Sequence, residues 1–232
     1  MLDERVKFAL DNFLILTPPN NSYKISFSEM CYELTEQSEE GRSRLILDVG
    51  TENNLCVTNY DGVPTWKILR KDGKFSLRKA VDHFILRKNC DHWELHMVEM
   101  KRSVGRKTWF NIKEKVRDCY FTIRALSVFL GISFRDEDIF IYTTYLNDKM
   151  NSDNDSASIR LPTGERATSS ADEWNNNCIT VKLLDFTSEE NPAVFPYTRI
   201  KMTCSINVKE LAQKRQLEEF LTMLKKPKET QK

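Results

Sequence analysis

Glycine is scarce in this chain, with 7 residues among 232, and no glycine-rich phosphate loop occurs in the sequence. The sequence also lacks a nucleophile elbow, and no two cysteines have the spacing of a metal-binding motif. These absences argue against P-loop nucleotide hydrolysis, serine-hydrolase chemistry and a zinc ion held by paired cysteines.

Long hydrophobic runs are absent as well, because no segment approaches the roughly 18 consecutive apolar residues that a membrane helix needs. The opening residues, MLDERVKFALDNF, carry acids where a signal peptide would be basic and then apolar. The six cysteines are scattered along the chain, as is typical of reduced core residues. We therefore expect a cytoplasmic protein with neither a membrane span nor an export signal.

The net charge of +1 conceals an uneven distribution of charge along the chain. Between Pro64 and Arg117 there are 15 Lys and Arg residues against 6 Asp and Glu, so the remainder is acidic. A basic segment in an otherwise acidic protein indicates a polyanionic partner, and a solvated lysine-rich surface would give the same count.

Apolar periodicity predicts helices and strands over residues 1–146. Leu2, Val6 and Leu10 recur at helical spacing, and Ser26 with Glu29 forms a capping-box pattern for a second helix that ends near residue 41. Apolar segments bounded by turn residues then predict strands at 44–49, 55–58, 65–69, 79–86 and 93–101.

The clearest helix is predicted at 108–131, with Thr108 able to cap its start and Gly131 able to end it. A mostly apolar strand at 138–146 follows. A helix between two such strands is typical of a crossover connection onto a buried sheet.

The pattern changes after residue 146, because 18 of the 31 residues from 147 to 177 are Asn, Asp, Ser, Thr or Gly. We expect a long polar loop there, peripheral to the core. Strands are predicted at 178–186 and 198–206, and an amphipathic helix at about 207–225. The predicted fold is α/β (α+β): residues 1–146 form a core with a mixed central sheet flanked by helices, and residues 178–232 add a β-hairpin plus helix.

Three polar residues at two predicted strand ends form the candidate site. Asp82 lies in AVDHF, and Glu99 and Lys101 lie in VEMK, where the period of a strand puts Glu99 and Lys101 on one face. Two carboxylates supply the hard oxygen ligands that suit Mg²⁺ or Mn²⁺. A lysine beside them can orient a metal-bound water and offset charge on a phosphate.

Asp82 followed by Glu99-x-Lys101, then a long helix and a strand, resembles the PD-(D/E)XK nuclease superfamily over residues 26–146. The resemblance implies a restriction-endonuclease-like core and a Mg- or Mn-dependent endonuclease acting on DNA rather than RNA, in restriction, repair or anti-phage defence. It also implies that Asp82 and Glu99 bind the metal with the Met100 carbonyl and that Lys101 positions the attacking water. A homodimer is a further expectation from the resemblance. Ser103 matches the small polar residue that often follows the lysine. Val81 stands in place of the proline of the family name.

An acid on the first core helix often assists in this family. Glu29, Glu33 and Glu36 are the candidates here, and the sequence does not choose among them.

The basic residues that follow the motif are the predicted contacts to the phosphate backbone. Some share an edge of the long helix and the others lead into it: Arg102, Arg106, Lys107, Lys113, Arg117 and Arg124.

Other interpretations remain open for the same residues. Asp82, Glu99 and Lys101 would also fit an ordinary surface salt bridge. Alternatively, the protein is a non-catalytic module that binds nucleic acid or protein on the same fold. A toxin-like or regulatory protein is a third possibility. His92 and His96 share one strand face and, with His83 or Cys90, offer a rival zinc site.

Overall fold

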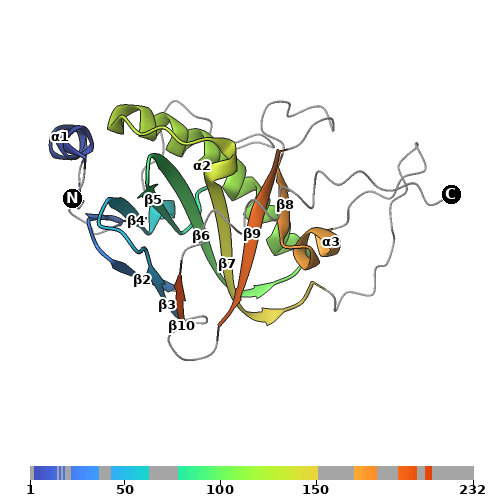
Figure 1. Ribbon diagram of the computed structural model, residues 1–232. Coiled ribbons are helices and arrows are strands. Elements are labelled where there is room, and N and C mark those ends of the chain that lie inside the picture. Colours follow the sequence, from blue (N-terminus) through green and yellow to red (C-terminus); the bar gives the residue numbers. More distant parts are fainter. Residues whose placement is uncertain are drawn as a thin grey trace.

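The computed structural model of the protein describes residues 3–14, 16, 18, 22–36, 43–62, 78–150, 170–181, 193–202 and 207–210. Within them a mixed sheet has the strand order β1-β4-β5-β6-β7-β9-β8 (Figure 1). The protein is therefore of mixed α/β class, as predicted. Its strands are β1 (Lys24–Phe27), β4 (Asn54–Thr58), β5 (His83–Asn89), β6 (His92–Val104), β7 (Ile139–Asp148), β8 (Cys178–Val181) and β9 (Ala193–Lys201).

The centre of this sheet has the predicted crossover. Strands β4, β5 and β6 pair antiparallel, whereas β6 and β7 pair parallel and are joined by helix α2 (Arg106–Leu130). Strand β9 then pairs parallel with β7, and β8 pairs antiparallel with β9. The C-terminal strands thus extend the central sheet. Strand β9 begins at Ala193, earlier than the predicted 198, because Phe195 and Tyr197 continue its buried alternation.

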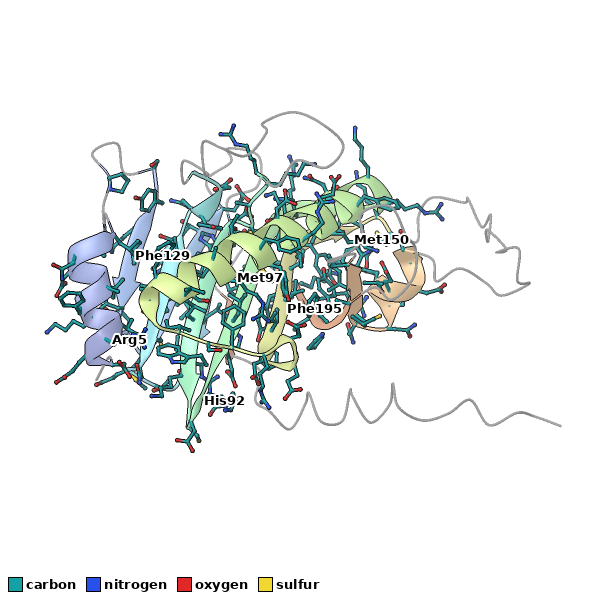
Figure 2. The ribbon with its side chains drawn as sticks, turned by 90° about the horizontal axis from the view of Figure 1, so that it is seen from above. Arg5, His92, Met97, Phe129, Met150 and Phe195 are labelled. Carbon is teal, nitrogen blue, oxygen red and sulfur yellow. The ribbon has the colours of Figure 1, made fainter. Side chains whose placement is uncertain are left out.

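Helix α2 covers one face of the sheet (Figure 1). Its apolar stripe packs on the inward side chains of β6 and β7, and the main cluster includes Trp109, Ile112, Val116, Cys119 and Ile123 from α2 with Leu95, Met97, Ile139 and Ile141 from the strands. Figure 2 shows α2 lying across the sheet, with its residue Phe129 toward α1 (Glu4–Phe13). Met150, which follows β7, lies toward α3 (Ser170–Asn175). The helix therefore runs over the strands that carry the candidate site.

The ends of α2 bear out one expectation and correct another. Gly131 adopts the left-handed conformation with φ 67° and donates to the carbonyls of Ser127 and Val128, so it ends the helix as predicted. At the other end, Gly105 is the N-cap and makes no side-chain cap bond. Thr108 lies inside the first turn and is not the cap.

A second, smaller sheet covers the opposite face of the central sheet. It has the order β10-β3-β2, formed by β2 (Cys31–Glu36), β3 (Ser43–Asp48) and β10 (Asn207–Glu210). Leu34, Leu45 and Leu47 of this sheet are fully buried against a cluster that includes Ile85 and Val98 of the central sheet. The core is thus divided into two apolar layers, one on each side of the central sheet.

The prediction of a helix from residue 26 to 41 is wrong. Residues 24–27 and 31–36 form β1 and β2, and Ser28 between them has a positive φ of 60°. In β2, Tyr32 and Leu34 are buried while Cys31 and Glu33 are exposed, which is the period of a strand. Sheet packing therefore overrode the local capping signal.

Other predicted segments differ in their limits. Residues 207–210 form β10 rather than the start of a helix, and the rest of the predicted helix lies outside the described residues, as does the strand predicted at 65–69. Most of the predicted polar loop, 151–169, also lies outside them. Its two edges join the core, because Met150 and Trp174 are fully buried.

Two short 3-10 turns complete the described structure, at Tyr60–Gly62 and at Asp136–Asp138. In the described part of the chain, no helix combines the length and apolar character needed to cross a bilayer.

Candidate functional site

Asp82 and Glu99 face each other across the start of the β5–β6 pairing. Because His83 pairs with Val98 in antiparallel register, the residue before His83 lies opposite the residue after Val98. Main-chain groups fix both carboxylates: Met100 N donates to Asp82 Oδ2 at 2.6 Å, and Asp82 N donates to Glu99 Oε2 at 3.2 Å. The hairpin therefore places the two acids together at one point of the sheet.

Lys101 lies beside them on the same face of β6. Its Nζ is 2.6 Å from Glu99 Oε1 and 3.6 Å from Asp82 Oδ2, and it donates to the Met100 carbonyl at 2.9 Å. Glu99 is 1% exposed, whereas Lys101 and Asp82 retain partial access to solvent. The three residues singled out in the sequence are thus in mutual contact at a partly open end of a buried strand.

Lys115 is a fourth member of the cluster, which the sequence reasoning missed. Its Nζ, carried by α2, lies 2.7 Å from Glu99 Oε1 and 3.2 Å from Asp82 Oδ1. A signal for it existed, because Ile112 and Cys119 flank it at i−3 and i+4 and both belong to the buried stripe of the helix. A lysine on that face must direct its ammonium group toward the sheet.

The segment that carries Asp82 is attached to α2 by hydrogen bonds. Lys79 N donates to Asp118 Oδ2 at 2.9 Å, and Val81 N donates to Cys119 Sγ at 3.1 Å. Asp118 and Cys119 follow Lys115 by about one helical turn. The same face of α2 therefore positions both Asp82 and the second lysine.

The mutual contacts shift the ionisation of the cluster. Burial opposes ionisation of Asp82, but Lys101, Lys115 and the Met100 N–H outweigh it and lower the pKa of Asp82. Burial, and then the charge of Asp82, raise the pKa of Glu99 to about 7 against the opposing effect of the two lysines. Burial alone would lower the pKa of Lys115, yet Glu99 and Asp82 raise it above its ordinary value.

The oxygen donors of this cluster suit a divalent cation. Carboxylates of Asp82 and Glu99 together with the Met100 carbonyl form a hard oxygen set of the kind Mg²⁺ and Mn²⁺ prefer. No group of three or more His, Cys, Asp or Glu side chains among the described residues is placed to hold a metal. A cation here would therefore depend on two carboxylates and a main-chain oxygen, all of which contact a lysine ammonium group.

The three alternative acids lie elsewhere than on a first core helix. Glu29 lies between β1 and β2, where its carbonyl accepts from Asn54 Nδ2 at 2.8 Å. Glu33 and Glu36 lie on β2, and Glu33 forms an exposed ion pair with Arg44. The expectation of a helical acid near the site is therefore corrected.

The predicted phosphate-binding residues fall into two groups. Arg102 and Lys107 are exposed and Arg106 is half-buried, at the junction of β6 and α2. The other three contact acids: Lys113 Nζ lies 2.9 Å from Glu173 Oε1, Arg117 Nη2 lies 2.9 Å from Asp118 Oδ1, and Arg124 pairs with Asp136. Lys113 thus joins α2 to α3, and Arg124 joins α2 to the turn at Asp136–Asp138, whereas Arg117 pairs within the helix.

The histidines do not converge on a zinc site in the described residues. His96 is fully buried between partners, with Nδ1 3.0 Å from Tyr142 Oη and Nε2 3.0 Å from Glu94 Oε2. His92 lies at the tip of the β5–β6 hairpin (Figure 2), and His83 Nδ1 accepts from Asn59 N at 3.2 Å. His96 therefore belongs to a buried polar network on the face of β6 opposite Glu99.

The prediction that Glu99 and Lys101 share one face of β6 is confirmed. Val98 and Met100 are fully buried in the layer against the smaller sheet, and Glu99 and Lys101 point the other way.

Comparison with family models, with curated proteins and with solved structures finds no match to this chain.

Proposed function

We propose that this protein is a metal-dependent nuclease that hydrolyses phosphodiester bonds, with DNA as its substrate. One observation carries the proposal: Asp82, Glu99 and Lys101 meet at one point, where an antiparallel strand pair is followed by a helix and a parallel strand. The PD-(D/E)XK pattern requires this order of elements around its two acids and its lysine. The arrangement of β4, β5, β6, α2 and β7 therefore supports a restriction-endonuclease-like core.

The chain's own residues have distinct tasks in this proposal. The carboxylates of Asp82 and Glu99 and the carbonyl of Met100 would hold Mg²⁺ or Mn²⁺, which supplies a polarised water and neutralises phosphate charge. Lys101 carries an ammonium group within hydrogen-bond distance of Glu99. It can hold the attacking water by a hydrogen bond and stabilise negative charge that develops on the phosphate oxygens.

The experiment that tests this proposal is a cleavage assay. Purified protein is incubated with supercoiled plasmid, linear DNA and RNA, each with Mg²⁺, Mn²⁺ or EDTA. The proposal expects cleavage of DNA with either metal and none with EDTA. Absence of cleavage under every condition, with the protein folded, would count against it.

A second candidate is a non-catalytic module that binds nucleic acid on the same fold. The observation that favours it is that Lys115, together with Lys101, already balances the charge of both carboxylates without a metal. This candidate predicts DNA binding that weakens with salt, no cleavage, and no effect of Mg²⁺ on the bound state.

A further inference from the structure

The site contains as many ammonium groups as carboxylates. Lys101 and Lys115 both contact Glu99 Oε1, at 2.6 and 2.7 Å, and both lie within 4 Å of an Asp82 oxygen. With both acids ionised the formal charges cancel. The two carboxylates therefore do not stand as an uncompensated pair that awaits a cation.

Lys115 cannot be an incidental surface contact, because its surroundings direct it to the site. Its side chain is 14% exposed, and it bridges the two acids from a different element than the one that carries either of them. The neighbouring turn of α2 is bonded to Lys79 N and Val81 N, so the helix and the Asp82 segment keep a fixed relation. The ammonium group is thus held at the oxygens a cation would use.

We infer that Lys115 is a built-in counter-ion that competes with the divalent cation for Asp82 and Glu99, so that cation and phosphate bind cooperatively. The inference rests on the proposed function, since it assumes that a metal and a nucleic-acid phosphate meet at this site. A phosphodiester gives the displaced Lys115 ammonium group a new anionic partner and compensates the added charge.

The physical basis is the charge balance of a poorly solvated site. A dication added to a neutral cluster leaves an excess of two positive charges close together, and such repulsion is strong where water is largely excluded. The negative phosphate removes part of that excess. Cation affinity should therefore be low in the free protein and higher when DNA is present, and by linkage the cation must strengthen DNA binding by the same factor.

The test measures Ca²⁺ binding by titration calorimetry at pH 8, above the pKa of Glu99. Ca²⁺ serves as the probe and no turnover is needed. The proteins are wild type, Lys115→Met, Lys115→Arg and the control Lys79→Met, because Lys79 also pairs with an acid of α2, Glu114, away from the two carboxylates. We expect Lys115→Met to bind Ca²⁺ at least about tenfold more tightly than wild type, and the other two variants to resemble wild type.

A second measurement needs no variant. Wild-type protein is titrated with Ca²⁺ in the presence and absence of a short DNA duplex, and the duplex should raise the affinity at least about fivefold. Equal affinity with and without the duplex would overturn the inference, and so would equal or weaker Ca²⁺ binding by Lys115→Met. This second measurement decides the matter if Lys115→Met fails to fold.

Different experimental results distinguish failure of this inference from failure of the proposed function. Cleavage by wild type with unchanged Ca²⁺ affinity in Lys115→Met would retain the nuclease and remove the counter-ion role. Tighter Ca²⁺ binding by Lys115→Met, with no cleavage by wild type, would retain the counter-ion and remove the nuclease.

Discussion

Glu99 connects the candidate site, because its two carboxylate oxygens contact three different parts of the chain. Oε1 accepts from Lys101 of its own strand and from Lys115 of α2, and Oε2 accepts from Asp82 N ahead of β5. A buried carboxylate with this many donors loses several interactions when its charge is removed. Changes at this position therefore report on the whole cluster.

Substitutions at the site separate a nuclease from a structural ion pair. Under the proposed function, Asp82→Asn and Glu99→Gln should abolish cleavage, because each removes the charge of a proposed metal ligand, and Lys101→Ala should lower turnover by roughly 10²-fold. Plasmid cleavage with Mg²⁺ checks this, with cooperative thermal unfolding as the control for folding. Wild-type cleavage by all three variants would leave only a structural ion-pair cluster at this position.

His96 makes the stability of the protein depend on pH. Burial lowers the pKa of His96 in the folded state below its ordinary 6.5, despite Glu94, so its contribution to stability is complete above 6.5 and is lost as pH falls toward the folded pKa. Burial opposes ionisation of Glu94, but His96, Asn89 and Arg87 lower its pKa, so its contribution is lost in the same direction, at lower pH. Tyr142 faces the other ring nitrogen of His96.

The measurement is the free energy of urea unfolding between pH 8 and pH 5, for wild type and His96→Gln. Glu99, whose pKa is raised to about 7, adds stability over the same interval, so the expected result is that wild type loses stability relative to His96→Gln as pH falls below about 6.5. His83 also has a lowered pKa, about 4, so only the difference between the two proteins isolates His96. Parallel pH profiles for the two proteins would contradict the prediction.

The sequence alone is enough to predict that Asp82, Glu99 and Lys101 lie together, because a hairpin brings its two strands together by local pairing. The period of two puts Glu99 and Lys101 on one side, and antiparallel register puts Asp82 opposite Glu99. Lys115 was missed because its contact depends on how α2 docks on the sheet, which spacing along the helix does not specify. Its position within the buried stripe was the available signal.

At the scale of elements, α2 joins the site to the segment before β5. Asp118 is fully buried, accepts from Lys79 N at 2.9 Å, and also holds Arg117. Tyr60 Oη donates to Thr122 Oγ1 one turn further along, at 3.0 Å. The position of Asp82 therefore depends on the polar groups of a helix that is far from it in sequence.

Asp118→Ala should weaken this attachment. The change leaves the Lys79 N–H without its acceptor and should lower the free energy of unfolding by about 1–3 kcal/mol. It should also reduce cleavage, because Asp82 loses its fixed place. Urea unfolding and plasmid cleavage check the two effects, with Glu114→Ala as the matched control, since Glu114 is an acid of the same helix whose partner Lys79 is exposed. Unchanged stability in Asp118→Ala would refute the proposed attachment.

Elements with strong local signals were predicted better than those fixed by distant pairing. Gly131 ends α2 as expected, because a left-handed residue at a helix end is favoured locally for glycine. The capping pattern of Ser26 and Glu29 misled, because burial of Tyr32 and Leu34 against other strands outweighs a local cap. The parallel pairing of β10 with β3 could not be predicted locally, because no residue spacing in the sequence indicates that these two distant segments pair.

At the scale of the whole molecule, the two faces of the central sheet differ in what covers them. Helix α2 covers the face with the site, and the smaller sheet covers the other (Figure 1). Basic residues of the β6–α2 junction lie at the end of the strand that carries Glu99 and Lys101. A polyanion bound near the site would therefore meet this junction before it meets the smaller sheet.

Charge reversal tests where a polyanion binds. Lys107→Glu should weaken DNA binding and reduce the slope of log affinity against log salt by about 1 or more, because a phosphate contact is lost and an acid is added. Fluorescence anisotropy at several salt concentrations measures this. Arg44→Glu on the smaller sheet is the control and should leave the slope unchanged. Equal effects of the two changes would place the nucleic acid elsewhere.

The pairing of β10 also determines the order in which the smaller sheet can be completed during translation. Asn207 pairs with Leu45, so β3 receives its second neighbour from a segment that comes much later in the sequence. During translation the β2–β3 hairpin emerges from the ribosome early, whereas the strand that covers its other edge is made late. Until then β3 presents an open edge to neighbouring nascent chains, the kind of edge to which other strands add. Among the described strands of the smaller sheet, the edge of β3 that pairs with β10 is thus completed last during synthesis.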